Sequence, residues 1–334
     1  VIKRDKIGDL LLTTPLLARL KSGLPQVETH LLANDYNAWV VAGNPHVDRL
    51  WVYRRARHAG RINLGGAWQS LWQNFALRRE RYDWVIVANG DESPRAIKRG
   101  LAVHGARTIA RCSDSAKYRG LTDSVPPDNA SHEVERLLGL LAPMGVSLSG
   151  RDSHPTYELP VESASFALGW LAERRLAPGK YVVLGLGARR AKKQPSTEQV
   201  LAWSAYLKKT WNLDTVFMWT PGKADDPLYP GDDDVAQPVL DAHVPQIHPF
   251  RGPIPEALGL MWSARTCLFP DSGLMHFAAA SPGGVLGFFA ETDLSPAPAQ
   301  WGPRGPRADY LEAGKSVAEL PAGLVYERLR KLLT

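Results

Sequence analysis

A short segment in the last quarter of the chain combines residues that suit the binding of an anionic group. The apolar run 267–269 ends at Pro270. Asp271, Ser272 and Gly273 follow, and then a helical pattern of small residues begins. This order predicts a strand, a tight turn and a helix N-terminus, which offers unpaired N–H groups and a partial positive charge to a phosphate. Gly273 lets such a group approach the backbone closely.

His276 lies about one turn into the predicted helix, on the side that reaches back over the turn. A plainer interpretation is open for the same segment. Asp and Ser are ordinary helix caps, and the histidine is then half-buried and without a role. The segment alone does not decide between these interpretations.

A second candidate is Asp9, a carboxylate near the start of the chain. Residues 1–3 are expected to end a strand, residues 4–9 to form a turn, and residues 10–21 show helical spacing interrupted at Pro15. Asp9 either complements the helix dipole as a cap or lies at the carboxyl end of a first strand, where open α/β sheets bind their ligands.

Basic residues indicate an anionic partner. The net charge is +6, and the densest basic segment, 54–61, contains Arg54, Arg55, Arg57 and Arg61. A charge run is usually a solvated loop. This one follows a predicted strand at 50–53, on the side where Asp9 is expected, and guanidinium groups bind phosphates and carboxylates in fork geometry.

The remaining pattern predicts two successive α/β halves with mainly parallel sheets, helices on both faces and a cleft between the halves. The turn-rich segment 150–160 marks the link, so we expect domains at 1–160 and 161–334. The C-terminal helix, 324–333, could return to the first domain. The expected strands are 27–32, 50–53, 84–88, 107–110, 181–184, 216–219, 267–269 and 285–289.

Two further segments carry expectations. Residues 66–81 predict an amphipathic helix whose aromatic residues, among them Trp72 and Phe75, belong to the core. The acidic, proline-rich stretch 225–238 predicts a loop, in which Asp232, Asp233 and Asp234 are solvated and hold no metal.

Other classes of protein are not favoured. Cys112 and Cys267 belong to no CxxC pair, so neither a disulfide framework nor a zinc site is expected, and a reducing compartment fits. No apolar run approaches the length of about 18 residues that a membrane span requires. Exposed aromatics are not interleaved with the arginines, so nucleic acid is not an expected partner.

Three segments resemble the signatures of glycosyltransferase family 9, the ADP-heptose:lipopolysaccharide heptosyltransferases. They are the stretch from Arg4 through Asp9 to Pro15, the loop 187–195 with its lysine and Pro195, and the segment 271–276. They follow the family's order, and the resemblance covers nearly the whole chain. Gln194 departs from the family, which usually has an aromatic residue there, and Ala188 replaces a common hydroxyl residue.

The resemblance implies a GT-B architecture, in which two Rossmann-like domains face each other across a cleft. It implies inverting transfer of a heptose from ADP-heptose to the lipopolysaccharide inner core, without a required metal and without a cofactor. By the same resemblance Asp9 is the general base and Lys192 meets the donor phosphates. The residues implied for the donor are Gly187, Ala188, Lys192, Asp225, Asp271, Ser272, Gly273, Leu274, Met275 and His276. Arg4 joins the four arginines of the basic segment as a residue for the acceptor.

The chemistry needs a base on the attacking hydroxyl and positive charge for the departing diphosphate. We expect Lys3, Arg4 or Lys6 to lower the pKa of Asp9. Lys192 and the N–H groups at 272–274 are expected to stabilise the leaving group.

Two alternatives stay open: transfer of another nucleotide-activated sugar, such as an N-acetylhexosamine, and non-catalytic binding of a nucleotide or glycan on the same scaffold. The expected acceptor is an anionic glycolipid. The expected location is the cytoplasm, with peripheral contact to the inner membrane through charge and a few exposed apolar residues.

Overall fold

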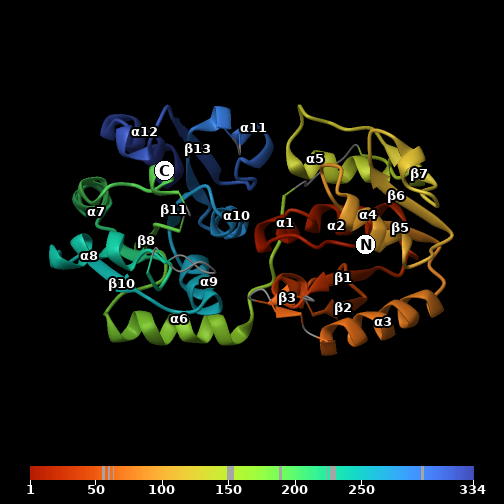
Figure 1. Cartoon of the computed structure of the whole chain (residues 1–334). Coiled ribbons are helices and arrows are strands. Elements are labelled where there is room, and N and C mark those ends of the chain that lie inside the picture. The colour runs from red at the N-terminus through yellow and green to blue at the C-terminus, as the bar shows by residue number, and fades with distance from the viewer. Residues whose placement is uncertain are drawn as a thin grey trace. The chain divides into compact units, whose positions relative to one another are not determined.

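The computed structural model of the chain describes residues 1–54, 57–58, 61–62, 64–148, 154–187, 190–223, 225, 231–294 and 297–334, with backbone alone for 57–58, 61–62, 64–71 and 294. The chain divides into two compact units, Val1–Tyr157 and Glu158–Thr334 (Figure 1). Each unit is an α/β fold with a parallel sheet. In the described part of the chain, no helix is both long enough and apolar enough to span a bilayer.

The sheet of the first unit is assembled around the chain start. β1 (His30–Asn34) pairs in parallel with β2 (Arg49–Tyr53), and β6 (Arg107–Arg111) pairs in parallel with β5 (Trp84–Ile86) and β7 (Asp123–Val125). Ile2 joins these two groups of strands through parallel bridges to Leu32 and Val87. The spatial order is therefore β2, β1, residues 1–3, β5, β6, β7, which is the order of a doubly wound sheet.

Helices and short antiparallel strands complete the first unit. The expected helix at 10–21 is divided into α1 (Ile7–Leu11) and α2 (Thr14–Gly23), because Pro15 is accommodated in the first turn of α2 rather than inside one long helix. The other elements are η1 (Ala38–Val41), β3 (Arg57–His58), β4 (Arg61–Ile62), α3 (Leu64–Arg79), α4 (Pro94–Leu101), η2 (Ser115–Lys117), α5 (Glu133–Leu138) and η3 (Gly139–Met144).

The second unit repeats the doubly wound order in one six-stranded parallel sheet. Its spatial order is β10 (Ile247–Phe250), β9 (Asp214–Met218), β8 (Tyr181–Gly185), β11 (Thr266–Pro270), β12 (Val285–Ala290), β13 (Ala308–Ala313). The order reverses between β8 and β11. Ligands of such sheets bind at this reversal, beyond the carboxyl ends of the strands.

The helices of the second unit cover this sheet. They are α6 (Val161–Glu173), η4 (Ala191–Lys193), α7 (Thr197–Trp211), α8 (Asp233–Asp241), α9 (Ile254–Trp262), α10 (Gly273–Ala280), η5 (Thr292–Leu294), α11 (Pro298–Trp301), η6 (Val317–Glu319) and α12 (Ala322–Leu333). A capping box starts α7: Ser196 Oγ accepts from Gln199 N, and Gln199 Oε1 accepts from Ser196 N.

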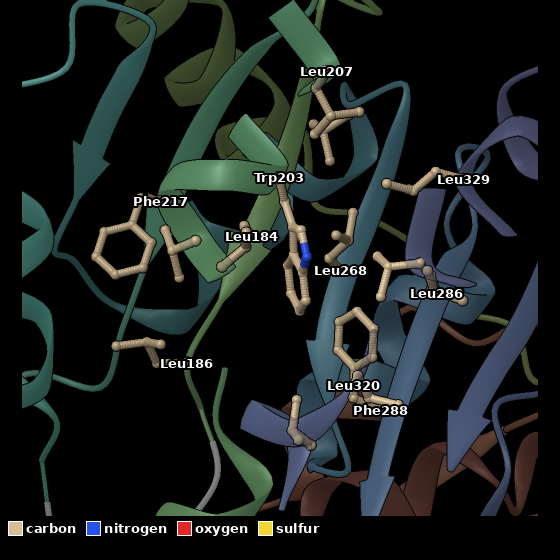
Figure 2. Close-up of a cluster of buried hydrophobic side chains, with 14 of the residues drawn as sticks. Leu184, Leu186, Trp203, Leu207, Phe217, Leu268, Leu286, Phe288, Leu320 and Leu329 are labelled. Atoms are coloured by element: carbon tan, nitrogen blue, oxygen red, sulfur yellow. The ribbon is translucent and has the colours of Figure 1, made fainter. Parts of the chain in front are cut away.

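A large apolar cluster fixes the sheet of the second unit (Figure 2). Trp203 of α7 is fully buried in it and stacks on Phe288 of β12, with ring centroids 5.0 Å apart. Leu184 of β8 and Leu268 of β11 belong to the same cluster. Burial of these side chains holds the ends of β8, β11 and β12 in register, and the segments that follow β8 and β11 contain all the candidate donor residues except Asp225.

Two structural expectations drawn from the sequence are wrong. Trp72 and Phe75 of α3 are 58% and 54% exposed, because the helix packs on the sheet through another face that includes Leu77. The stretch expected to be a loop contains α8, whose acidic first turn complements the helix dipole. Asp232 at its start is buried rather than solvated.

Candidate functional site

Two loops meet where the strand order of the second unit reverses. A Cβ atom added to Gly187, beyond β8, would lie 4.0 Å from Ser272 Oγ, in the turn between β11 and α10. At Gly185 an added Cβ would lie only 2.1 Å from Phe269 Cε1, so this strand end has no room for a side chain. The structure thus brings the loop after β8 against the turn that the sequence singled out.

A buried ion pair ties the two loops together. Lys193 is 5% exposed, and its Nζ donates a charged hydrogen bond to Asp271 Oδ2. Ser272 is the N-cap residue of α10, yet its side chain makes no capping bond, and its buried Oγ has no hydrogen-bond partner in the described part of the chain. The interpretation of Ser272 as an ordinary cap therefore fails, and the first N–H groups of α10 are suited to an anionic ligand.

Lys192 lies at the same edge of the sheet. Its Nζ donates to Glu291 Oε1 at 2.6 Å, and its side chain is 62% exposed. Glu291 follows β12, the neighbour of β11, and the hydrogen bond from Lys192 lowers the pKa of its carboxyl. Lys193 and Glu291 are not recognisable as site residues from the sequence, because their partners lie 78 and 99 residues away along the chain.

The other residues implied for the donor differ in exposure. Gly273 and Leu274 open α10 and are partly exposed, whereas Met275 and His276 are buried in the packed side of the helix. Asp225 is an exposed turn residue. Ala188 lies outside the described residues.

Gln194, the departure from the family pattern, is a buried structural residue. Its Nε2 donates to Asp232 Oδ1 at 2.6 Å, and Asp232 Oδ2 accepts from Thr220 N at 3.2 Å. The side chain therefore connects the loop after β8 to the segments around β9 and α8.

In the first unit the strand order reverses between residues 1–3 and β5, and a buried cation lies at this reversal. Lys3 is 1% exposed, and its Nζ lies 3.2 Å from Asp5 Oδ2 and 3.9 Å from Glu133 Oε1. Asn89 Nδ2 donates to Asp5 Oδ2 at 2.7 Å. Gly90 N donates to Glu133 Oε1 at 3.2 Å.

Asp9 lies in the first turn of α1 and interacts electrostatically with this cluster. Burial raises the pKa of its carboxyl, Asp5 adds to the increase, and Lys3 and Lys6 oppose it. The expectation that nearby cations hold this pKa low is therefore wrong: Lys3 and Lys6 do lower it, but desolvation outweighs them and the net shift is upward. A raised pKa makes Asp9 a stronger proton acceptor than an ordinary surface aspartate.

Arg4 is the first of the arginines that we expect to bind the acceptor, and it lies in the segment that contains Asp5 and Asp9. Arg4 Nε donates to Tyr53 OH at 3.4 Å, and Arg4 O accepts from Asn34 Nδ2 at 2.7 Å. Arg54 directly follows β2 and is exposed. The backbones of Arg57 and Arg61 belong to the β3–β4 ribbon. Arg55 lies outside the described residues.

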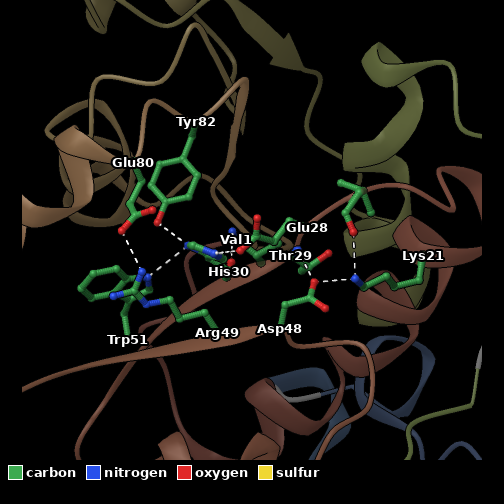
Figure 3. Close-up of polar contacts among 11 residues, drawn as sticks. Val1, Lys21, Glu28, Thr29, His30, Asp48, Arg49, Trp51, Glu80 and Tyr82 are labelled. Carbon is green, nitrogen blue, oxygen red and sulfur yellow. Dashed lines mark hydrogen bonds and ion pairs between the residues drawn. The ribbon is translucent and has the colours of Figure 1, made fainter.

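Polar residues at the amino edge of the same sheet have structural partners (Figure 3). His30 Nδ1 lies 2.7 Å from Tyr82 OH, and His30 Nε2 lies 2.8 Å from Glu28 Oε1. Asp48 accepts from Thr29 N at 2.6 Å and from Lys21 Nζ. These groups hold the starts of the strands, at the end of the sheet opposite to Asp9.

Two doubly wound parallel units are the architecture of the GT-B glycosyltransferases. The sequence pattern of glycosyltransferase family 9 (heptosyltransferase) matches residues 68–317, so this chain belongs to that family and is a glycosyltransferase. The resemblance seen in the sequence is thereby confirmed. No curated protein sequence matches the chain.

Solved structures share the fold along the whole chain. A glycosyl transferase family 9 protein from Veillonella parvula has a TM-score of 0.80 and 17% identity, over 99% of this chain and 95% of that chain. E. coli ADP-heptose LPS heptosyltransferase II has a TM-score of 0.73 and 17% identity, over 99% and 97%. E. coli heptosyltransferase WaaC, solved with ADP, has a TM-score of 0.75 and 17% identity, over 99% and 98%.

Proposed function

We propose that this glycosyltransferase moves a heptose from ADP-heptose to the inner core of lipopolysaccharide, with inversion and without a cofactor. The observation that carries the proposal is the pairing of a lysine loop with the uncapped N-terminus of α10, at the sheet reversal of the second unit. Family membership supports heptose as the sugar, and the E. coli relative solved with ADP supports adenosine diphosphate as the leaving group.

In the proposed reaction, an acceptor hydroxyl attacks the anomeric carbon of the heptose as the bond from that carbon to the diphosphate breaks. Asp9 accepts the proton of the hydroxyl. ADP leaves with the bonding electron pair, and Lys192 and the N–H groups at 272–274 stabilise its charge as it develops. Gly187, Gly273 and Asp225 contribute to donor binding, and Arg4 and the arginines of residues 54–61 bind the anionic acceptor.

Two variants test the role of Asp9 as the base separately from the role of Lys192 in binding the diphosphate. We expect Asp9→Asn to reduce kcat by about 10²–10⁴-fold while ADP still raises the melting temperature. We expect Lys192→Met to weaken the effect of ADP on the melting temperature as well as the rate. A fully active Asp9→Asn enzyme would remove Asp9 from the mechanism.

The same thermal-shift measurement tests the donor, with ADP-heptose compared against UDP- and GDP-sugars. The proposal requires ADP-heptose to give the largest stabilisation. A larger shift with a UDP-N-acetylhexosamine would favour the alternative that the sequence left open, and binding without any transfer would favour a non-catalytic role.

We also propose that the enzyme works in the cytoplasm in peripheral contact with the inner membrane. The support is a stripe on α3 made of Trp72, Phe75 and Arg79, which are spaced to share one face of the helix. Trp72 and Phe75 pack edge to face with ring centroids 6.2 Å apart, and the Arg79 guanidinium lies 5.8 Å from the Phe75 ring. Aromatic side chains beside arginines suit the interface of an anionic bilayer.

A further inference from the structure

Lys192, the lysine proposed to meet the diphosphate, is already paired with an acid of the same unit. The hydrogen bond from its Nζ to Glu291 Oε1 is 2.6 Å long. The two partners differ in exposure, since the side chain of Lys192 is 62% exposed and that of Glu291 is 16% exposed. The carboxylate is thus the partner held by the protein, and the lysine is the partner that solvent or a ligand reaches.

The backbone fixes Glu291 in place. The residue directly follows the last pair of β12 with β13, Ala290 with Ala313. Its N–H donates to Gly314 O at 3.3 Å, and its φ of 54° is in the left-handed region, which non-glycine residues rarely adopt. A strained residue at the end of a strand beside the proposed phosphate site indicates a functional constraint.

Three cations surround the carboxylate of Glu291. Lys192, Arg190 and Lys193 all act electrostatically on Glu291 and lower the pKa of its carboxyl, with the hydrogen bond from Lys192 as the largest cause. Of these cations, Lys193 is also paired with Asp271. Glu291 is therefore an internal anion on the lysine that the donor diphosphate needs, and the two anions compete for it.

We propose that Glu291 is a positioning residue that holds Lys192 when no donor is bound and releases it to the diphosphate when the donor arrives. The exchange weakens the binding of donor and product alike, and so it favours the release of ADP after transfer. This inference rests on the proposed role of Lys192.

The experiment is a double-mutant cycle, with ADP affinity measured by isothermal titration calorimetry for the wild-type enzyme, Glu291→Gln, Lys192→Met and the double variant. Glutamine keeps the shape of glutamate and removes its charge. We expect Glu291→Gln to tighten ADP binding about three- to fivefold, the range typical of an ion pair with one exposed partner. We expect Lys192→Met to weaken it about tenfold, and Glu291→Gln to have no further effect in the Lys192→Met background.

Asp293→Asn is the matched control, because Asp293 is an exposed acid two residues away. It removes the same charge from the same segment, and we expect its ADP affinity to stay that of the wild type. Equal tightening by Asp293→Asn and Glu291→Gln would reduce the effect to general electrostatics and overturn the proposal. Steady-state kinetics give a second readout: Glu291→Gln should lower the KM for the donor and strengthen inhibition by ADP.

The outcomes separate this inference from the proposed function. Unchanged ADP affinity in Lys192→Met would refute the role of Lys192 and both proposals with it. Weaker ADP binding in Lys192→Met together with unchanged or weaker binding in Glu291→Gln would refute the exchange alone, and weaker binding in the glutamine variant would place Glu291 on the donor itself.

Discussion

Asp9 is a partly buried acid and Lys3 is a buried base, and each shifts the pKa of the other. Burial disfavours the charged form of Lys3, yet Asp9, Asp5 and Glu133 together raise its pKa. Burial raises the pKa of Asp9, and Lys3 limits the increase. The same desolvation that strengthens Asp9 as a base makes its ionised form unfavourable in the folded protein.

Asp9→Asn should therefore stabilise the protein while it slows transfer. The folded-state pKa of Asp9 lies above its unfolded value, so ionisation at neutral pH opposes folding, and the opposition disappears as the pH falls below both values. We expect a gain of about 1 kcal/mol in the free energy of unfolding at pH 7 and a smaller gain at acidic pH. Thermal denaturation at both pH values measures it, with the exposed Glu312→Gln as control. A lower melting temperature for Asp9→Asn at pH 7 would contradict the argument.

Lys3→Met should move the acid limb of the pH–rate profile to higher pH, because Lys3 lowers the pKa of Asp9. Asp5→Asn should move the same limb to lower pH, since Asp5 raises that pKa. Lys6→Met, which removes an exposed cation, should act in the direction of Lys3→Met. The measurement is kcat/KM against pH, with circular dichroism to confirm folding. Shifts of the same sign in Lys3→Met and Asp5→Asn would rule out Asp9 as the titrating base.

At the scale of the element, the functional groups are placed by the segments that follow strands rather than by the strands themselves. The loop after β8, the turn after β11 and the residue after β12 contribute Lys192, Ser272 and Glu291. Parallel pairing puts all these strand ends on one edge of the sheet. In the first unit, the segments after residues 1–3 and after β5 contribute Asp5 and Gly90 in the same way.

Gly90→Ala tests how closely these segments approach. An added Cβ would lie 2.1 Å from Glu133 Oε2, so Glu133 must move away from Gly90 N and from Lys3. We expect a loss of about 1–3 kcal/mol in unfolding free energy, measured by urea denaturation. Gly169→Ala in α6, where nothing lies within 4 Å of the added atom, should instead stabilise by about 0.5–1 kcal/mol. Wild-type stability in Gly90→Ala would show that the contact is not close.

Trp72→Ser with Phe75→Ser tests the membrane-binding role of α3. We expect cosedimentation with phosphatidylglycerol vesicles to fall at least about tenfold, because two large apolar side chains lose their contact with lipid. Transfer to a water-soluble acceptor should be unchanged. Val161→Ser with Leu168→Ser in α6 removes two other exposed apolar side chains and should leave vesicle binding intact. Equal sedimentation of both double variants would contradict the proposal.

The whole molecule consists of two units, Val1–Tyr157 and Glu158–Thr334, each built on the doubly wound strand order. The proposed reaction uses the two sites differently, since the first contributes Asp9 as the base and the second contributes cations. In that proposal the charge of the leaving diphosphate is met by Lys192 and the N-terminus of α10, while Lys193 is paired with Asp271.

Activity is accordingly expected to survive chelation. Within the described residues, no group of three or more His, Cys, Asp or Glu side chains is arranged to hold a metal ion. Transfer measured after treatment with EDTA should proceed within about twofold of the untreated rate, because the proposed reaction assigns the diphosphate charge to Lys192 and the N-terminus of α10. Loss of activity that Mg²⁺ restores would contradict this prediction.

Much of the fold could be predicted from the local pattern. The buried strands β8, β9, β11 and β12 lie within two residues of the apolar runs that predicted them. Short strands such as β7 and β10 were missed, because their sequences lack a distinct apolar run. The exposure of Trp72 and the helix α8 were predicted wrongly, since both depend on which face of an element finds a partner.

The sequence by itself determined the family, the parallel α/β pattern and the positions of Asp9, Lys192 and the turn before α10, because these follow from neighbouring residues. The tertiary structure alone decided how those groups behave. It raised the pKa of Asp9 by burial, paired Lys193 with Asp271, and placed Glu291 on Lys192 from 99 residues away. Desolvation and long-range ion pairs depend on what the folded chain brings together, and no local pattern records them.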